Sequence, residues 1–197
     1  MGYAETINRV MLGDFTGATE DEKARAAKEL IQVCSVAASA VTIQPIPFLD
    51  TALLAPIQIG MVQGIGKIHG YKLDKKSIVE ILSTFGASLV AQNVMMAAAK
   101  FVPFFGWVVT LSMAYALTYA IGEVSTYYFK NGRGTSQAEL KSMFERVYKE
   151  KKAEKEESNR KNASLKDRLE QLKEAKASGL LTDEEFERKK EDLLRSF

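Results

Sequence analysis

The sequence contains very little cysteine, histidine and proline: one cysteine, one histidine and four prolines. A single thiol, Cys34, excludes an intrachain disulfide framework and a thiolate-rich metal site. Its place in an apolar stretch predicts a small buried hydrophobic side chain. His69 has no second histidine with which to form a metal cluster, and we expect an ordinary surface or helix-capping residue. Alternating runs of β-branched residues are also rare, which argues against a sheet and predicts an all-α fold.

Motifs of catalysis are missing too. The chain has no His-Glu-x-x-His, no Gly-x-Ser-x-Gly and no paired cysteines, so we predict no enzyme activity, catalytic residue, metal or cofactor. The formal net charge of +2 gives no electrostatic case for nucleic acid as a partner. Residues 1–19 lack the basic region and apolar run of a signal peptide, and we therefore expect the N-terminus to stay in the cytoplasm.

Charge is scarce in the middle of the chain and abundant after it. Asp50 is the only Asp, Glu, Lys or Arg from Leu30 to Gly66, and Lys100 is the only one from Ile81 to Gly122. Roughly half of residues 130–197 are charged. The length allows one core and an appended module. We predict four parts, which are an N-terminal segment (1–18), a hydrophobic helical domain (19–130), a charged helical linker (131–162) and a two-helix module (163–197).

Two apolar runs, Ile81–Ala99 and Phe104–Gly122, are separated by a very short connection, Lys100–Pro103. Each run is close to the ~20 residues that cross a bilayer core, and so short a connection predicts an antiparallel helical hairpin. Basic residues flank both ends, which places both ends and the C-terminal module on the cytoplasmic side of a bacterial inner membrane. Polar residues inside the runs, such as Thr118, leave the alternative that the hairpin is buried in protein and that the protein lies in the cytoplasm.

A capping box predicts the first helix of the hydrophobic domain. In Thr19-x-x-Glu22, the hydroxyl and the carboxylate can each satisfy an orphan backbone group at a helix N-terminus. We expect a helix from there to Val41. The following turn contains Pro45 and Pro47, which stop a helix because a proline ring cannot donate a backbone hydrogen bond.

The second helix is expected to run from Asp50, or just after it, to about His69. Asp50 is predicted to be its N-cap, where a carboxylate suits the helix dipole. Pro56 inside this run implies a kink or a late start. Pro103 and Gly106 lie in a similar turn, because Pro103-Phe104-Phe105-Gly106 resembles Pro47-Phe48-Leu49-Asp50 and is also followed by an apolar helix.

Glycines are the notable feature of the second helix. Gly60, Gly64 and Gly66 would each cost a helix in water about 1 kcal/mol against alanine. We predict that tight helix–helix packing compensates for this cost, because spacings such as Gly60-x-x-x-Gly64 let another helix approach closely. The alternative is that Gly70 is a helix C-cap and that the other glycines are incidental.

The charged tail contains two further capping boxes, Ser136-x-x-Glu139 and Thr182-x-x-Glu185. The first opens a helix that extends through the linker as a solvated spacer, and the second opens the last helix of the module. Two short helices cannot bury enough surface alone, so the module needs a second copy of itself or another partner. The apolar positions that we predict to mediate oligomerisation are Leu165, Leu169, Leu172, Phe186 and Leu193.

Residues from about Leu165 to Leu194 resemble the short C-terminal (SHOCT) domain family. The resemblance rests on the leucine stripe at 165, 169 and 172, on Gly179-Leu180-Leu181-Thr182-Asp183-Glu184-Glu185-Phe186, and on Lys189, Lys190 and Leu193. Such modules are typically appended to bacterial proteins, often membrane ones, and the resemblance implies a role in oligomerisation or protein contacts. It implies no catalytic residue.

Residues from about Ala24 to Phe129 resemble domain-of-unknown-function family 697. The residues that carry this resemblance are Pro45 to Asp50, Gln58, Gly70-Tyr71, Pro103 to Gly106, Thr118 and Gly122. That family is often joined to an Era-like GTPase domain. This chain has no Gly-x-x-x-x-Gly-Lys-Ser/Thr loop to hold a nucleotide phosphate, so the resemblance implies at most a GTPase partner in trans.

The leading hypothesis is a non-enzymatic, membrane-associated scaffold that contacts lipid and forms homo-oligomers through its tail. The rival hypothesis is a soluble helical regulatory partner of a separate GTPase. A pore or small transporter has only Asp50 and Lys100 in its favour.

Overall fold

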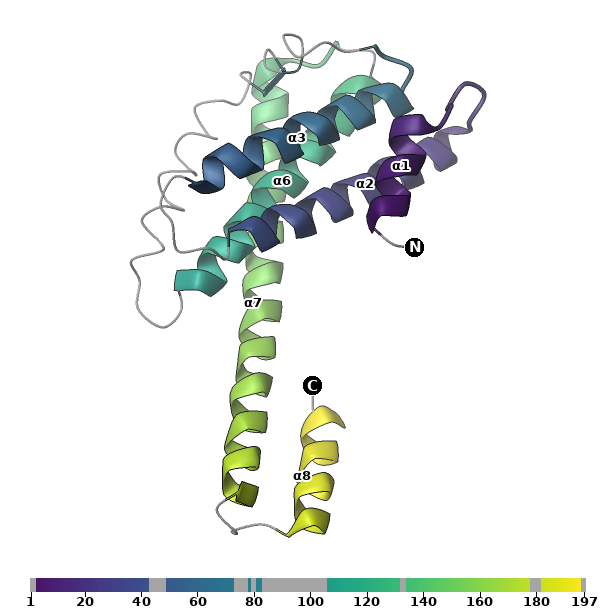
Figure 1. Ribbon diagram of the computed structural model, residues 1–197. Helices are drawn as coiled ribbons and strands as arrows, with labels where there is room; N and C mark the ends of the chain where they lie inside the picture. Colours follow the sequence, from purple (N-terminus) through teal and green to yellow (C-terminus); the bar gives the residue numbers. More distant parts are fainter. Residues whose placement is uncertain are drawn as a thin grey trace. The chain divides into compact units, whose positions relative to one another are not determined.

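Every regular element in the described part of the chain is an α-helix (Figure 1). The structure is a computed structural model that describes residues 3–42, 49–72, 78, 81–82, 106–131, 134–177 and 182–195. Its helices are α1 (Tyr3–Leu12), α2 (Glu20–Val41), α3 (Leu49–Ile68), α6 (Gly106–Lys130), α7 (Gln137–Ala177) and α8 (Asp183–Arg195). These elements confirm the all-α prediction. Pro45, Pro47, Pro103 and most of the run Ile81–Ala99 lie outside the described residues.

The chain divides into two compact units, Met1–Ala153 and Glu154–Phe197. In the first unit α2 packs against both α3 and α6, and α3 packs against α6. On α2 the residues Ala27, Ile31, Cys34 and Ala38 recur every three or four positions, and all four are buried. This spacing puts them on one face of the helix, so the core lies where the three helices meet.

Helix α1 was not predicted. It packs against α2 and α3 (Figure 1), and among its described residues Thr6 and Val10 are buried. Arg9 forms an ion pair with Glu29 of α2. Two buried positions make too short a stripe to reveal a helix in the sequence, and a helix of this length is stabilised mainly by its tertiary contacts.

The ends of α2 and α3 follow the local signals in the sequence. The predicted capping box of α2 is confirmed, with the Glu22 N–H donating to Thr19 Oγ1 at 3.3 Å and the Thr19 N–H donating to Glu22 Oε2 at 2.8 Å. Gly70 has a positive φ of 83°. Its N–H donates to the Lys67 carbonyl at 3.0 Å, and the Tyr71 N–H donates to the Gly66 carbonyl at 2.8 Å. These two bonds form a Schellman motif, so Gly70 is the C-cap of α3.

Helix α3 begins slightly earlier than predicted. It starts at Leu49, so Asp50 is its second residue, and Pro56 lies inside it. The late start that Pro56 implied is therefore not observed. The Pro56 side chain is exposed, which keeps its ring out of the helix contacts of the core.

Helix α6 carries most of the second predicted apolar run and continues beyond it. Its side chains Leu117, Ile121 and Val124 are buried in the core shared with α2 and α3. Among the helices in the described ranges, none combines the length and the apolar character that a bilayer crossing requires. The first run of the predicted hairpin is described only at Ile81 and Leu82, so the pairing of the two runs stays a prediction.

Helix α7 begins on the first unit. The Glu139 N–H donates to Ser136 Oγ at 3.2 Å, as expected for an N-cap. The Glu139 carboxylate does not complete the predicted box but accepts a hydrogen bond from the Tyr127 hydroxyl of α6 at 2.7 Å. Leu140 and Phe144 are buried in the core of the first unit. The helix is continuous to Ala177, so the predicted linker and the first module helix are one element.

The second unit contains the last turns of α7 and helix α8. The capping box predicted for α8 is confirmed. The Thr182 N–H donates to Glu185 Oε2 at 3.0 Å, and the Glu185 N–H donates to Thr182 Oγ1 at 3.2 Å. Phe186 is buried. Lys176 of α7 lies over its ring, with Nζ 4.7 Å from the centroid, and forms an ion pair with Asp183 at 2.8 Å. These contacts join α7 to α8 within the unit.

Candidate functional site

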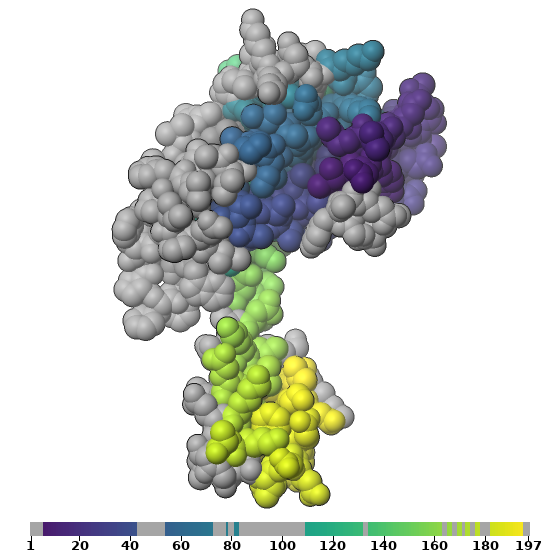
Figure 2. Space-filling view, viewed as in Figure 1, coloured from purple at the N-terminus to yellow at the C-terminus, as the bar shows by residue number. Residues whose placement is uncertain are grey.

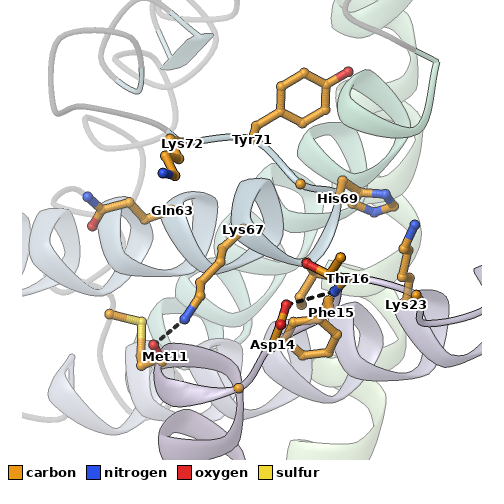
Figure 3. A pocket seen from close by; sticks show the side chains of 14 residues that line it. Met11, Asp14, Phe15, Thr16, Lys23, Gln63, Lys67, His69, Tyr71 and Lys72 are labelled. Carbon is orange, nitrogen blue, oxygen red and sulfur yellow. Dashed lines mark hydrogen bonds between the residues drawn. The ribbon is translucent and has the colours of Figure 1, made fainter.

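A pocket of about 670 Å³ lies in the first unit beside the loop that joins α1 to α2 (Figure 3). One wall is the loop from Gly13 to Gly17, and the other is the end of α3 with the residues that follow it, from Lys67 to Lys72. Met11 adds an apolar side chain from the end of α1. Gly17, with a φ of 87°, gives the loop a left-handed turn that other residues rarely adopt.

The pocket is lined by more basic than acidic side chains. Lys23, Lys67 and Lys72 line it, whereas Asp14 is the acid among the lining residues described. The Thr16 N–H donates to Asp14 Oδ1 at 2.8 Å (Figure 3). Hydrogen bonding from the Thr16 side chain, then from this backbone N–H, and more weakly the charge of Lys67, lowers the pKa of Asp14 below its ordinary value. Asp14 is therefore ionised at neutral pH, and the pocket keeps a net positive lining.

Lys67 holds α1 in place. Its Nζ donates a hydrogen bond to the carbonyl of Met11 at the end of α1 (Figure 3). A cation at a helix C-terminus also interacts favourably with the negative end of the helix dipole. Lys23 forms an ion pair with Glu20 at 3.0 Å. Two of the three lysines thus have a structural contact in addition to their charge.

His69 is the least expected residue of the pocket. It lies just after α3 and is half-buried, and its Nε2 atom is buried without a hydrogen-bond partner. Burial is the main reason that the pKa of His69 lies below its ordinary value, and the nearby cations Lys23 and Lys130 lower it further, while Glu20 opposes them. The imidazole is therefore neutral at pH 7. We predicted that His69 is an ordinary surface or helix-capping residue. The burial of its Nε2 atom was not foreseen, because the sequence gives no measure of burial at a helix end.

Apolar side chains on α1, the helix that contributes Met11 to this pocket, reach the solvent. Ile7, Met11 and Leu12 are 40%, 48% and 83% exposed. The fourth large apolar side chain that is exposed in the described residues is Leu194 of α8, at 50%. Three of four such side chains thus lie on one short helix, and Met11 itself lines the pocket.

Polar side chains inside the core form bonds between the helices. Gln58 Nε2 of α3 donates to Thr118 Oγ1 of α6 at 3.3 Å, and Ser39 Oγ of α2 donates to the Leu111 carbonyl of α6 at 2.9 Å. Ser125 Oγ instead donates to the Ile121 carbonyl in its own helix at 2.7 Å. Of the polar residues in the second apolar run, Thr118 therefore connects α6 to α3.

The predicted packing glycines differ in their surroundings. A Cβ added at Gly64 would lie 2.6 Å from Leu30 Cδ2 and 3.1 Å from Val10 Cγ1, so α1, α2 and α3 meet there. Gly66 is buried, and an added Cβ at Gly60 would meet no atom within 4 Å. A slightly tighter contact between two helices involves Gly122, where an added Cβ would lie 2.5 Å from Ile31 Cγ1. We had not assigned a packing role to Gly122.

The other predicted site residues lie in several parts of the chain. In the second unit Leu165, Leu169, Leu172 and Leu193 are only partly buried, whereas Phe186 is buried. Their role in oligomerisation stays a prediction. Gly106 begins α6. The pocket itself was missed, because its residues come from separate stretches of polar sequence without a recognisable motif.

Comparison with known proteins gives two family matches and a relative. Residues 167–194 match the Short C-terminal domain (SHOCT), and residues 15–153 match the family described as Domain of unknown function (DUF697). The chain is similar to Magnetosome membrane protein 22 of Magnetospirillum gryphiswaldense, with 29% identity over 126 residues. The aligned region covers 59% of this chain and 65% of that protein.

No solved structure matches the chain. The longer family match begins in the loop before α2 and includes α2, α3, α6 and the start of α7, so it contains the core of the first unit apart from the contribution of α1. Because it covers more than half of the sequence, the protein belongs to the DUF697 family, and a SHOCT domain follows its family region.

Proposed function

We propose that this protein is a non-enzymatic scaffold that associates with a bacterial membrane and assembles through its C-terminal module. The observation that carries membrane association is the alignment with a protein named as a magnetosome membrane protein. That alignment covers less than two thirds of this chain. The proposed location is the cytoplasmic face of the inner membrane, and cytoplasm is the alternative.

Assembly is supported by the apolar surface that the second unit leaves uncovered. Leu194 is half exposed, and Leu165, Leu169, Leu172 and Leu193 are only partly buried within the unit. A unit of two helices gains little stability from its own core. Contact between copies would bury these leucines further and would give a multivalent scaffold.

Fractionation of cells tests membrane association. The full-length protein is expressed in bacteria, the cells are broken without detergent at low salt, and the membranes are collected by ultracentrifugation. We expect the protein in the pellet. Recovery in the supernatant would overturn the proposal. An alkaline carbonate wash of the pellet then separates two forms of association, because a surface-bound protein is released and an integrated one is retained.

The mass of the protein in solution tests assembly. Light scattering coupled to size-exclusion chromatography is applied to the wild type and to Leu169→Glu with Leu172→Glu, which should lower the oligomeric mass. Leu194→Glu changes a more exposed position and serves as a second variant in which the unit stays folded. The matched control is Lys166→Glu with Lys173→Glu, which places glutamates at exposed positions of the same helix and should leave the mass unchanged.

The rival function, partnership with a GTPase in trans, rests on family resemblance. The sequence has no nucleotide-binding loop of the Gly-x-x-x-x-Gly-Lys-Ser/Thr type, so a nucleotide would have to be held by the partner. Purification of the tagged protein from its native cells, with and without a non-hydrolysable GTP analogue, checks this alternative. A nucleotide-dependent GTPase in the eluate would favour it over the scaffold.

A further inference from the structure

Helix α1 is firmly attached although it is short. Val10 is fully buried and contacts the position of Gly64, Lys67 donates to the Met11 carbonyl, and Arg9 pairs with Glu29. The exposed apolar side chains of α1 therefore belong to an anchored helix rather than to a fraying end. Figure 2 shows α1, in purple, at the surface of the first unit.

The surroundings of Met11 are basic. Met11 lines the same pocket as Lys67 and Lys72, and Lys72 is exposed. Asp14 also lines the pocket, but its carboxylate accepts the Thr16 N–H. The neutral imidazole of His69 adds no charge of either sign. An apolar surface next to lysines thus faces solvent on one side of the unit.

We propose that this surface, the docking face formed by Ile7, Met11, Leu12, Lys67 and Lys72, binds the surface of an anionic lipid bilayer. The inference rests on the proposed membrane association and specifies how the contact is made. Amphipathic helices bury their apolar side chains about 5–10 Å into the boundary between headgroups and acyl chains. Each nearby Lys contributes attraction to anionic headgroups, at roughly 1 kcal/mol per residue.

Charge complementarity selects the occupant of this face. A second copy of the chain would place the same lysines against each other, which is unfavourable. An anionic bilayer satisfies the lysines and the apolar side chains together. This mode of contact needs no helix that crosses the membrane, and its apolar residues precede the core helices of the family region.

Vesicle binding by the full-length protein is the first test. Sedimentation with vesicles of phosphatidylcholine alone, and of phosphatidylcholine with phosphatidylglycerol, measures the partition coefficient. We expect binding to the anionic vesicles that weakens as salt is added. Ile7→Ser with Leu12→Ser should lower the partition coefficient by about tenfold or more, because two membrane-facing apolar side chains are lost. Lys72→Glu should lower it by about tenfold.

Matched controls come from the second unit. Lys189→Glu reverses one exposed charge on α8, and Lys166→Glu reverses one exposed charge on α7. Both should leave the partition coefficient within about twofold of the wild type. Unchanged circular dichroism and thermal midpoints in all variants would show that the differences come from the surface and not from unfolding.

An environment-sensitive dye locates the contact directly. Cys34 is buried, and burial raises its pKa to about 11, so it reacts poorly with thiol reagents at neutral pH. A dye attached to Leu12→Cys should shift its emission to the blue when anionic vesicles are added. The same dye on Lys189→Cys should not shift, because that exposed residue of α8 lies outside the docking face.

Each outcome decides between the inference and the function on which it rests. Equal vesicle binding by the wild type and the docking-face variants would overturn the inference while membrane association stands. No binding of the wild type to either vesicle, with the protein still in the membrane pellet of cells, would also overturn it. If the docking-face variants had a lower oligomeric mass than the wild type in solution without vesicles, the face would be assigned to contact with a second copy of the chain. Recovery in the soluble fraction of cells would remove the proposed function itself.

Discussion

Ile31 of α2 lies so close to Gly122 of α6 that a Cβ added at the glycine would be 2.5 Å from Ile31 Cγ1. Both residues are buried in the core of the first unit. Cγ1 belongs to a β-branched side chain with few rotamers, so it cannot move away easily. The close contact of α2 and α6 at this point therefore depends on the absence of a side chain at Gly122.

Gly122→Ala should lower the free energy of unfolding by about 1–2 kcal/mol, because the strain of overpacking exceeds the gain in helix propensity. Gly60→Ala is the matched control, since an added Cβ there meets no atom within 4 Å. It should raise stability by up to about 1 kcal/mol. Urea titration followed by circular dichroism measures both. Equal effects of the two substitutions would contradict the packing at Gly122.

The hydrogen bond between Gln58 and Thr118 should be worth more than its length suggests, because both side chains are buried. Thr118→Val leaves the Gln58 amide without this acceptor and should cost about 1–3 kcal/mol. The double variant with Gln58→Leu should cost less than the sum of the two single changes. Thr126→Val is the control, since that hydroxyl bonds to the Gly122 carbonyl of its own helix. Additive single effects would show that the pair is not coupled.

The stability of the first unit should fall as the pH drops below about 6.5, which is the ordinary pKa of histidine. Burial lowers the pKa of His69 in the folded protein, so the unfolded chain binds this proton first and acid favours unfolding. The contribution is absent above about pH 6.5, where both states are neutral. His69→Gln should remove this slope, measured by urea titration between pH 7 and 5. A slope that persists in the variant would assign it to another group.

Thr182→Ala should weaken α8 and leave the first unit unchanged. It removes an N-cap that is worth about 1 kcal/mol in typical helices, and the amide of Glu185 should then exchange faster with solvent. Thr19→Ala is the matched variant, because the same box opens α2 in the other unit. Hydrogen exchange followed by mass spectrometry compares the two. Faster exchange at α8 in both variants would mean that the two units are not independent.

Local signals in the sequence predicted several of the helix ends. The boxes at Thr19 and Thr182 and the C-cap at Gly70 act through hydrogen bonds between residues a few positions apart, so the sequence contains all of their partners. Helix α7 runs without interruption from Gln137 to Ala177, across the boundary between the predicted linker and the predicted module. The later part of α7 within the predicted linker has no apolar stripe on its surface, and this lack does not end the helix.

Contacts between distant parts of the chain could not be predicted in the same way. The spacing Gly60-x-x-x-Gly64 does not tell which glycine faces a neighbour, and Gly122 has no glycine partner at that spacing. The pocket requires that Lys67 and Met11 meet, and these residues are far apart in sequence. Such contacts follow from how α1, α2 and α3 pack, which depends on side-chain shapes across three helices.

Cys34 has a consequence for any assembly of this chain. It is the single cysteine of the sequence, and it is buried between helices with its thiol held protonated. Copies of the protein therefore have no accessible thiol with which to form a covalent link. Complexes built from this chain should come apart on dilution, and oxidants or reductants should not change how readily they do so.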